Sequence, residues 1–218
     1  MKMIKVIATI SVLLAPMLTY GSNVVGQKYI IVAALEQETA NADLEQYAPI
    51  VYTGVGKVNA AIKLYDAIVK YQPDLVINYG TAGSINGGAG LYHIDTFVQV
   101  DMDTRPLGTL RGVTPFSEEE LPEDTGVVLG TGDSFITDSK NQLEGLNIRI
   151  DFVDMEGYAL NKVCTHLNVA FQSYKNVSDS ADSDANEDWS QNVSNGVQLF
   201  KDMLRSKYGV SQLIVGMK

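Results

Sequence analysis

The chain has 218 residues, 45% of them hydrophobic, and a mean hydropathy near zero, which is typical of a soluble globular protein with one domain. It carries 16 Lys and Arg against 26 Asp and Glu, so its formal net charge is −10. Nucleic acids and anionic membrane surfaces attract basic patches, and this balance therefore argues against both as partners.

The first 21 residues have the composition of a secretory signal peptide. Lys2 and Lys5 precede residues 6–18, a mostly apolar run, and the small residues Gly21 and Ser22 follow it. A basic start, a short apolar run and small residues at the cleavage site define such a signal. The run is too short to span a bilayer comfortably. We therefore expect export, to the periplasm or outside the cell, and no stable membrane anchor after processing.

The alternative is that residues 4–14 form a first core strand, in which case the protein would be cytoplasmic. Residues 29–34 (Tyr-Ile-Ile-Val-Ala-Ala) are a better first strand, because a continuous apolar run suits a strand that is covered on both faces.

From residue 27 onward the chain alternates between strand-like and helix-like segments, as an α/β domain does. Residues 57–71 are predicted to form a helix, because apolar side chains recur on one helical face. These side chains are Ala61, Leu64, Tyr65, Ile68 and Val69. The other predicted strands are 75–77, 96–102, 126–129, 152–155 and 169–177, and the other helices are 156–166 and a closing helix around 193–204. We predict one α/β domain over residues 27–215, after the signal peptide at 1–21.

Cys164, the single cysteine, lies in the apolar stretch 160–167. It has no partner for an intramolecular disulfide, and no Cys/His spacing indicates zinc. We predict a buried structural thiol.

Two short motifs are similar to common binding loops but lack a required residue. The glycine turn at 54–57 is followed by Val58, where a phosphate-binding P-loop needs Ser or Thr. Asp182 begins like a calcium loop, but Glu187 occupies the sixth position, which requires glycine, and Val193 the twelfth. We predict no metal site, and the two histidines lie in different segments without a partner for a catalytic triad.

Two distant segments carry the most informative chemistry. Residues 153–157 and 178–182 each follow an apolar, strand-like run and contain small residues and a carboxylate, Glu156 in the first and Asp179 in the second. Open α/β sheets place their ligands where strands end and loops begin. Two acids in one crevice could bind the hydroxyls of a sugar and protonate a leaving group.

Six segments in order, across nearly all of residues 28–207, resemble the purine nucleoside phosphorylase/nucleosidase superfamily. The closest resemblance is to 5′-methylthioadenosine/S-adenosylhomocysteine nucleosidases. The segments are 34–38, 53–58, 78–83, 131–136, 155–156 and 178–179.

This resemblance implies a three-layer α/β/α domain with a mixed central sheet, nucleoside phosphorylase-like. It implies hydrolysis of the N-glycosidic bond of adenosine-type nucleosides, 5′-methylthioadenosine or S-adenosylhomocysteine, with release of adenine, as in methionine salvage. It further implies a small-molecule purine nucleoside as the partner, a homodimer, and no cofactor.

The resemblance also assigns roles to single residues. Glu38 matches the glutamate that positions the attacking water, and Asp179 matches the acid that protonates N7 of the departing purine. Glu156 matches the ribose-binding acid, Phe135 the ring that stacks on the base, and Trp189 the aromatic residue that closes over the 5′ substituent. The substrate-binding residues so implied are Val55, Thr81, Phe135, Ile136, Met155, Glu156, Ser178 and Trp189.

Two alternatives stay open: a purine nucleoside phosphorylase, and a non-catalytic nucleoside-binding protein on the same fold. Phosphorylases of the superfamily bind phosphate with arginines, and Asn78 stands at one of those positions here. The acidic turn at 36–38 would also repel a phosphate dianion. The presence of Glu38 and Asp179 favours an enzyme over a binder, whereas Asn78 and the acidic turn favour water over phosphate as the nucleophile.

The chain departs from the family pattern at three places. The segment before the 53–58 turn is short, the segment from 102 to 126 is predicted to lack a helix, and Lys175 stands where an arginine is usual. These differences bear on the 5′ pocket and on subunit contacts. The preference for a particular 5′ substituent is therefore left open.

Overall fold

The computed structural model describes residues 28–208 except residues 41, 119 and 124. The predicted signal peptide at 1–21 lies outside the described residues, as do residue 27 and residues 209–215 of the predicted domain. No helix within the described ranges combines the length and the apolar character that a membrane crossing requires.

The described strands form one mixed sheet of eight, with the order β2-β1-β3-β7-β6-β5, and β8 pairs with both β3 and β4. The strands are β1 (Tyr29–Ala33), β2 (Ile50–Tyr52), β3 (Leu75–Ser84), β4 (Leu91–Ile94), β5 (Thr96–Gln99), β6 (Val128–Thr131), β7 (Phe152–Asp154) and β8 (Ala170–Asp179). β1, β3 and β8 are parallel to one another, whereas β7 is antiparallel to β3 and β4 is antiparallel to β8.

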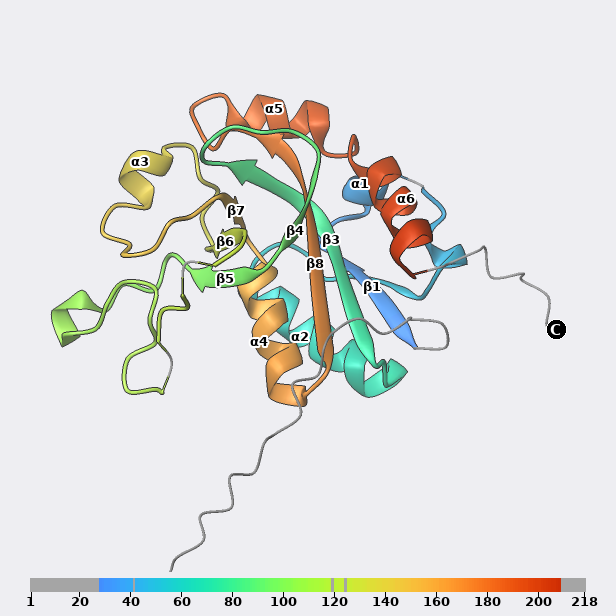
Figure 1. The fold of residues 1–218 in the computed structure, drawn as a ribbon, viewed down its shortest axis with the longest axis horizontal. Coiled ribbons are helices and arrows are strands. Elements are labelled where there is room, and N and C mark those ends of the chain that lie inside the picture. Colours follow the sequence, from blue (N-terminus) through green and yellow to red (C-terminus); the bar gives the residue numbers. More distant parts are fainter. Residues whose placement is uncertain (1–27, 41, 119, 124, 209–218) are drawn as a thin grey trace, which may run out of the picture.

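Helices cover both faces of the sheet (Figure 1). The α-helices are α1 (Glu36–Thr39), α2 (Lys57–Tyr71), α3 (Ser139–Gln142), α4 (Gly157–Leu167), α5 (Ala185–Asn192) and α6 (Val197–Tyr208), and two short 3-10 helices are η1 (Leu44–Gln46) and η2 (Arg105–Leu107). α2 and α4 pack with Ile30 and Val32 of β1, and α6 packs with Ile31, because successive residues of a strand point to opposite faces. The predicted three-layer α/β/α fold is confirmed.

One edge of β3 pairs with two different strands, and this opens the sheet at its centre. β1 pairs with β3 from Leu75 to Asn78, and β7 pairs with Gly83 and Ser84 on the same edge, while β8 follows the other edge. The chain leaves β1 at Ala33 for α1 and leaves β7 for α4. Strand ends that diverge in this way leave a crevice for a ligand.

β3 differs from the sequence prediction in its length. The prediction ended this strand at residue 77, but β3 continues through the glycine-containing segment 78–83 to Ser84. The reason is tertiary, because β8 pairs with β3 along this stretch and satisfies its backbone hydrogen bonds. The predicted strands at 96–102 and 126–129 are also displaced, since β5 ends at Gln99 and β6 spans Val128–Thr131.

The elements that the sequence prediction missed are short. They are α1, η1, β2, β4, α3 and α5, and Trp189 lies on α5. The segment from 102 to 126, which was predicted to lack a helix, contains the 3-10 helix η2 but no α-helix among its described residues.

The helix predicted at residues 57–71 is confirmed as α2, but only Leu64 and Ile68 of its predicted apolar face are buried. Tyr65 and Val69 are exposed, and the buried residues are Ala60, Leu64, Ala67 and Ile68. α2 therefore carries a second apolar face toward solvent. Cys164 is fully buried in the cluster beneath α2 and α4, as predicted, and burial raises the pKa of its thiol to about 12.

Candidate active site

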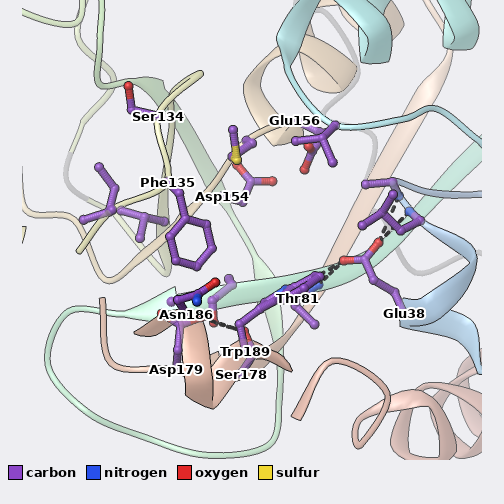
Figure 2. Close-up of a pocket in the computed structure, with 18 residues that line it drawn as sticks. Glu38, Thr81, Ser134, Phe135, Asp154, Glu156, Ser178, Asp179, Asn186 and Trp189 are labelled. Atoms are coloured by element: carbon purple, nitrogen blue, oxygen red, sulfur yellow. Dashed lines mark hydrogen bonds between the residues drawn. The ribbon is translucent and has the colours of Figure 1, made fainter. Parts of the chain in front are cut away.

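A cavity of about 230 Å³ lies where β1, β3, β7 and β8 end (Figure 2). All ten site residues predicted from the sequence line it, although they come from distant segments. They are Glu38, Val55, Thr81, Phe135, Ile136, Met155, Glu156, Ser178, Asp179 and Trp189.

Glu38 is held by four hydrogen-bond donors. The backbone N–H groups of Ala34 and Leu35 each donate to Oε2 at 3.0 Å, because Glu38 caps the start of α1. Thr81 donates twice to Oε1, from its backbone N–H at 2.8 Å and from its hydroxyl at 3.0 Å. The carboxylate is 4% exposed, so its orientation is fixed at the wall of the cavity.

Thr81 also contacts the aromatic residue of α5. The indole Nε1–H of Trp189 donates to Thr81 Oγ1 at 3.1 Å. A chain of hydrogen bonds therefore leads from Trp189 through Thr81 to Glu38.

Asp179 lies at the end of β8 and is almost fully buried. Burial raises the pKa of its carboxyl above the ordinary value. The backbone N–H of Ala181, 3.0 Å from Oδ1, and the hydroxyl of Ser178, 2.8 Å from Oδ2, oppose this rise in pKa. The side chain of Asp179 can lie this close to β3 because residue 83 is a glycine. A Cβ at Gly83 would lie 2.6 Å from Asp179 Oδ1. A buried carboxyl with a raised pKa has the character of a general acid.

Glu156 precedes α4 and faces the glycine turn that begins α2. The backbone N–H of Gly56 donates to Glu156 Oε1 at 2.9 Å, and Gly56 has a φ of +95°, a conformation that side chains disfavour. Burial, with a further contribution from the neighbouring Asp154, raises the pKa of Glu156 to about 8.

The sequence prediction missed Asp154 as a pocket residue. Asp154 Oδ2 accepts from the Gly157 N–H at 2.8 Å and lies 2.8 Å from Lys175 Nζ, and Oδ1 accepts from the Thr131 hydroxyl at 2.6 Å. The signal was present, since Lys175 occurs within a strand and a charged side chain that is fully buried needs a partner. Ser134 and Asn186 also line the cavity and were not predicted.

The lining residues separate into two ends. Figure 2 shows Phe135 and Asp179 at one end of the pocket and Glu38 at the opposite end, with Glu156 between them along the wall. None of the lining residues that the structure describes is Arg, Lys or His. No three or more His, Cys, Asp or Glu side chains of the described residues are grouped so that they could hold a metal ion. This arrangement can hold a flat ring beside an acid and a polyhydroxyl group beside two carboxyl groups.

Comparison with known proteins gives the same assignment as the six segments. A family model described as the phosphorylase superfamily matches residues 36–117 and 102–206. A 5′-methylthioadenosine/S-adenosylhomocysteine nucleosidase of Exiguobacterium sp. is 33% identical over 162 residues, which cover 63% of this chain and 69% of that protein. A nucleosidase of the same description from Geobacillus thermodenitrificans is 26% identical over 208 residues, 84% of this chain and 87% of that protein.

Two solved structures have the same fold. The native futalosine hydrolase of Helicobacter pylori has a TM-score of 0.72 at 20% identity and covers 84% of this chain and 97% of its own. The S-adenosylhomocysteine nucleosidase of Streptococcus pyogenes, in complex with 5-methylthiotubericidin, has a TM-score of 0.72 at 20% identity and covers 85% and 98%. The chain therefore belongs to the phosphorylase superfamily and, within it, to the family of 5′-methylthioadenosine/S-adenosylhomocysteine nucleosidases.

Proposed function

We propose that the protein hydrolyses the N-glycosidic bond of adenosine-type nucleosides, with 5′-methylthioadenosine or S-adenosylhomocysteine as the substrate, and releases adenine. The observation that carries the proposal is the placement of two carboxyl groups at opposite ends of one cavity, Asp179 beside Phe135 and Glu38 far from both (Figure 2). The nucleosidase relatives support the substrate class. A role in methionine salvage follows for a protein that consumes 5′-methylthioadenosine.

The purine would lie against Phe135, with its N7 toward Asp179. Cleavage of the glycosidic bond leaves the bonding electron pair on the purine, and a proton from Asp179 neutralises it. The raised pKa of Asp179 keeps a larger share of this carboxyl protonated near neutral pH than an exposed aspartate would have. General acids of this kind contribute about 10²- to 10⁴-fold to the rate.

The sugar would lie between Glu156 and Glu38. Glu156 accepts hydrogen bonds from the ribose hydroxyls, and negative charge along this wall stabilises the positive charge that develops on the sugar. Glu38 accepts a proton from the water that attacks the anomeric carbon. The products are free adenine and a 5′-modified ribose with a hydroxyl at C1.

A phosphorylase is the second enzymatic candidate, and the charge of the cavity argues against it. The nearest buried cation, Lys175, lies 2.8 Å from Asp154 and is neutralised by it. The acidic turn that carries Glu36 and Glu38 would also repel a phosphate dianion. A non-catalytic nucleoside binder would have no need for an acid at the base end of the pocket.

One experiment separates these candidates. The purified protein is incubated with 5′-methylthioadenosine, S-adenosylhomocysteine, futalosine and adenosine, with and without phosphate, and the sugar product is identified by mass. We expect a free 5′-modified ribose at a rate that does not depend on phosphate. A ribose 1-phosphate product would assign the protein to the phosphorylases, and binding without any product would assign it to the binders.

Trp189 supports the 5′-alkylthio preference, because its ring lines the cavity from α5. An alkylthio group that buries its apolar surface against the indole ring would be preferred over a hydroxyl by about 1–3 kcal/mol. We expect Trp189→Ala to raise KM for 5′-methylthioadenosine more than KM for adenosine. Equal increases in KM for both substrates would contradict the assignment of Trp189 to the 5′ pocket.

The second apolar face of α2 supports a homodimer. This face consists of four apolar side chains at helical spacing that are between 47% and 67% exposed: Val58, Ile62, Tyr65 and Val69. A second copy of this chain would cover this face. We expect a dimer by light scattering and a monomer for Ile62→Glu, and a monomeric wild-type protein would contradict the proposal.

Export is the remaining proposal, and it rests on the composition of residues 1–21. Amino-terminal sequencing of the native protein should give a start near Ser22. Protein that retains Met1 or Lys2 and stays in the cytoplasm would contradict it.

A further inference from the structure

The hydrogen bond between Trp189 and Thr81 joins two elements that are 108 residues apart in the sequence. The indole N–H can only donate, so Thr81 Oγ1 must accept from it. The hydroxyl proton of Thr81 therefore has to point elsewhere, and Glu38 Oε1 lies 3.0 Å away to receive it. Trp189 thus determines which way the Thr81 hydroxyl donates.

The Thr81 hydroxyl is the one adjustable donor among the four that hold Glu38. The other three donors are backbone N–H groups, of Ala34, Leu35 and Thr81 itself, and their directions are fixed by α1 and β3. A hydroxyl rotates about its C–O bond and settles where its neighbours direct it. The orientation of Glu38 Oε1 therefore depends on a contact from α5.

α5 is itself tied to the base end of the pocket. The side-chain amide of Asn192 donates to the backbone carbonyl of Ser178 at 2.9 Å, next to Asp179. α5 thus contacts the segment that carries the proposed acid and, through Trp189, the residue that orients the proposed base. The ring of Trp189 and its N–H group can serve different purposes, since the hydrogen bond to Thr81 comes from the N–H.

We propose that Trp189 is a positioning residue that acts through the Thr81 hydroxyl on Glu38. In this role it assists the hydrolytic step, separately from any contact of its ring with the 5′ substituent. The inference rests on the proposed function, because its catalytic consequence requires that Glu38 activates water.

The contact itself is tested by NMR spectroscopy. Trp189 is the only tryptophan, so ¹⁵N-labelled protein gives a single indole N–H signal. We expect this signal to move and its hydrogen exchange to accelerate in Thr81→Val, and both to stay near wild type in Thr81→Ser, which keeps the hydroxyl. An indole signal unchanged by Thr81→Val would overturn the inference, whatever the outcome for the proposed function.

The catalytic consequence is tested by a double-mutant cycle. Trp189→Phe keeps an aromatic ring and removes the donor, and we expect it to lower kcat about five- to tenfold with little change in KM. Thr81→Val should lower kcat at least as much. The double variant should be no slower than Thr81→Val alone, because both changes remove the same interaction.

The proposal would be overturned if the double variant lost kcat by the product of the two single losses. It would also be overturned if Trp189→Phe changed KM and left kcat unchanged. The matched control is Glu187→Gln, an exposed residue of the same helix, which should keep wild-type kinetics. If the wild-type protein cleaves no nucleoside, the proposed function and the kinetic role of Trp189 fail together, whereas the NMR result still decides the contact.

Discussion

Lys175 Nζ lies 2.8 Å from Asp154 Oδ2, and the two side chains are 3% and 1% exposed. Burial alone lowers the pKa of the Lys175 ammonium, but the carboxylates of Asp154, Glu156 and Glu38 together outweigh burial and raise it. Gly80 allows this grouping, because a Cβ there would lie 3.0 Å from Lys175 Nζ and 3.1 Å from Glu38 Oε1. One ammonium thus lies among three carboxyl groups beneath the pocket.

Removal of this ammonium should destabilise the protein. Lys175→Met leaves Asp154 buried without its counter-ion, and we expect a loss of roughly 3–5 kcal/mol in the free energy of unfolding, measured with urea. Lys140→Met, at an exposed position of α3, should have almost no effect. The double variant Asp154→Asn/Lys175→Met should be more stable than Lys175→Met alone, and a double variant that is less stable would contradict the pairing.

The role of Asp179 as proton donor predicts a loss of turnover without a loss of binding. We expect Asp179→Asn to lower kcat by about 10²- to 10⁴-fold, because proton donation acts in the transition state, and to leave nucleoside binding by calorimetry within roughly tenfold. Asp202→Asn, at an exposed position of α6, serves as the control. Near-normal turnover of Asp179→Asn would contradict the assignment of Asp179 as the proton donor.

The hydrogen bond from Ser178 to Asp179 allows a prediction about the pH dependence of kcat/KM. The Ser178 hydroxyl donates to Asp179 Oδ2 at 2.8 Å and so stabilises the charged form and lowers the pKa of Asp179. Ser178→Ala should raise that pKa further. Since a general acid must be protonated, the decline of kcat/KM on the alkaline side should move to higher pH. A decline that keeps its position or moves to lower pH would show that another group controls it.

Glu156 predicts how stability depends on pH. Its ordinary pKa is 4.5 and its pKa in the folded protein is about 8, so between these values the unfolded chain has lost a proton that the folded protein retains. Stability therefore falls as the pH rises from 4.5 to 8, by at most about 1.4 kcal/mol per pH unit. Glu156→Gln lacks this titration, and its stability relative to wild type should rise from pH 5 to pH 8 in urea unfolding.

The control for this measurement is Glu187→Gln, whose curve should run parallel to that of the wild-type protein. Parallel curves for Glu156→Gln as well would mean that Glu156 is already ionised throughout this range.

The sequence by itself determined the fold class, the family and the ten pocket residues. The apolar periodicity of residues 57–71 predicted α2 to the residue, because helix formation depends on neighbours three and four positions apart. Glu156, just after β7, and Asp179, at the end of β8, could be predicted to line one cavity, because strand ends in an open sheet share one crevice.

The tertiary structure decided what surrounds these residues. β3 continues through a glycine-rich segment only because β8 pairs with it, and no local signal contains that information. The contact of Trp189 with Thr81 and the pairing of Lys175 with Asp154 join segments that only the folded sheet brings together. The raised pKa values of Asp179 and Glu156 arise mainly from burial. Burial is a property of the packed molecule, so the sequence could name these acids but not their protonation.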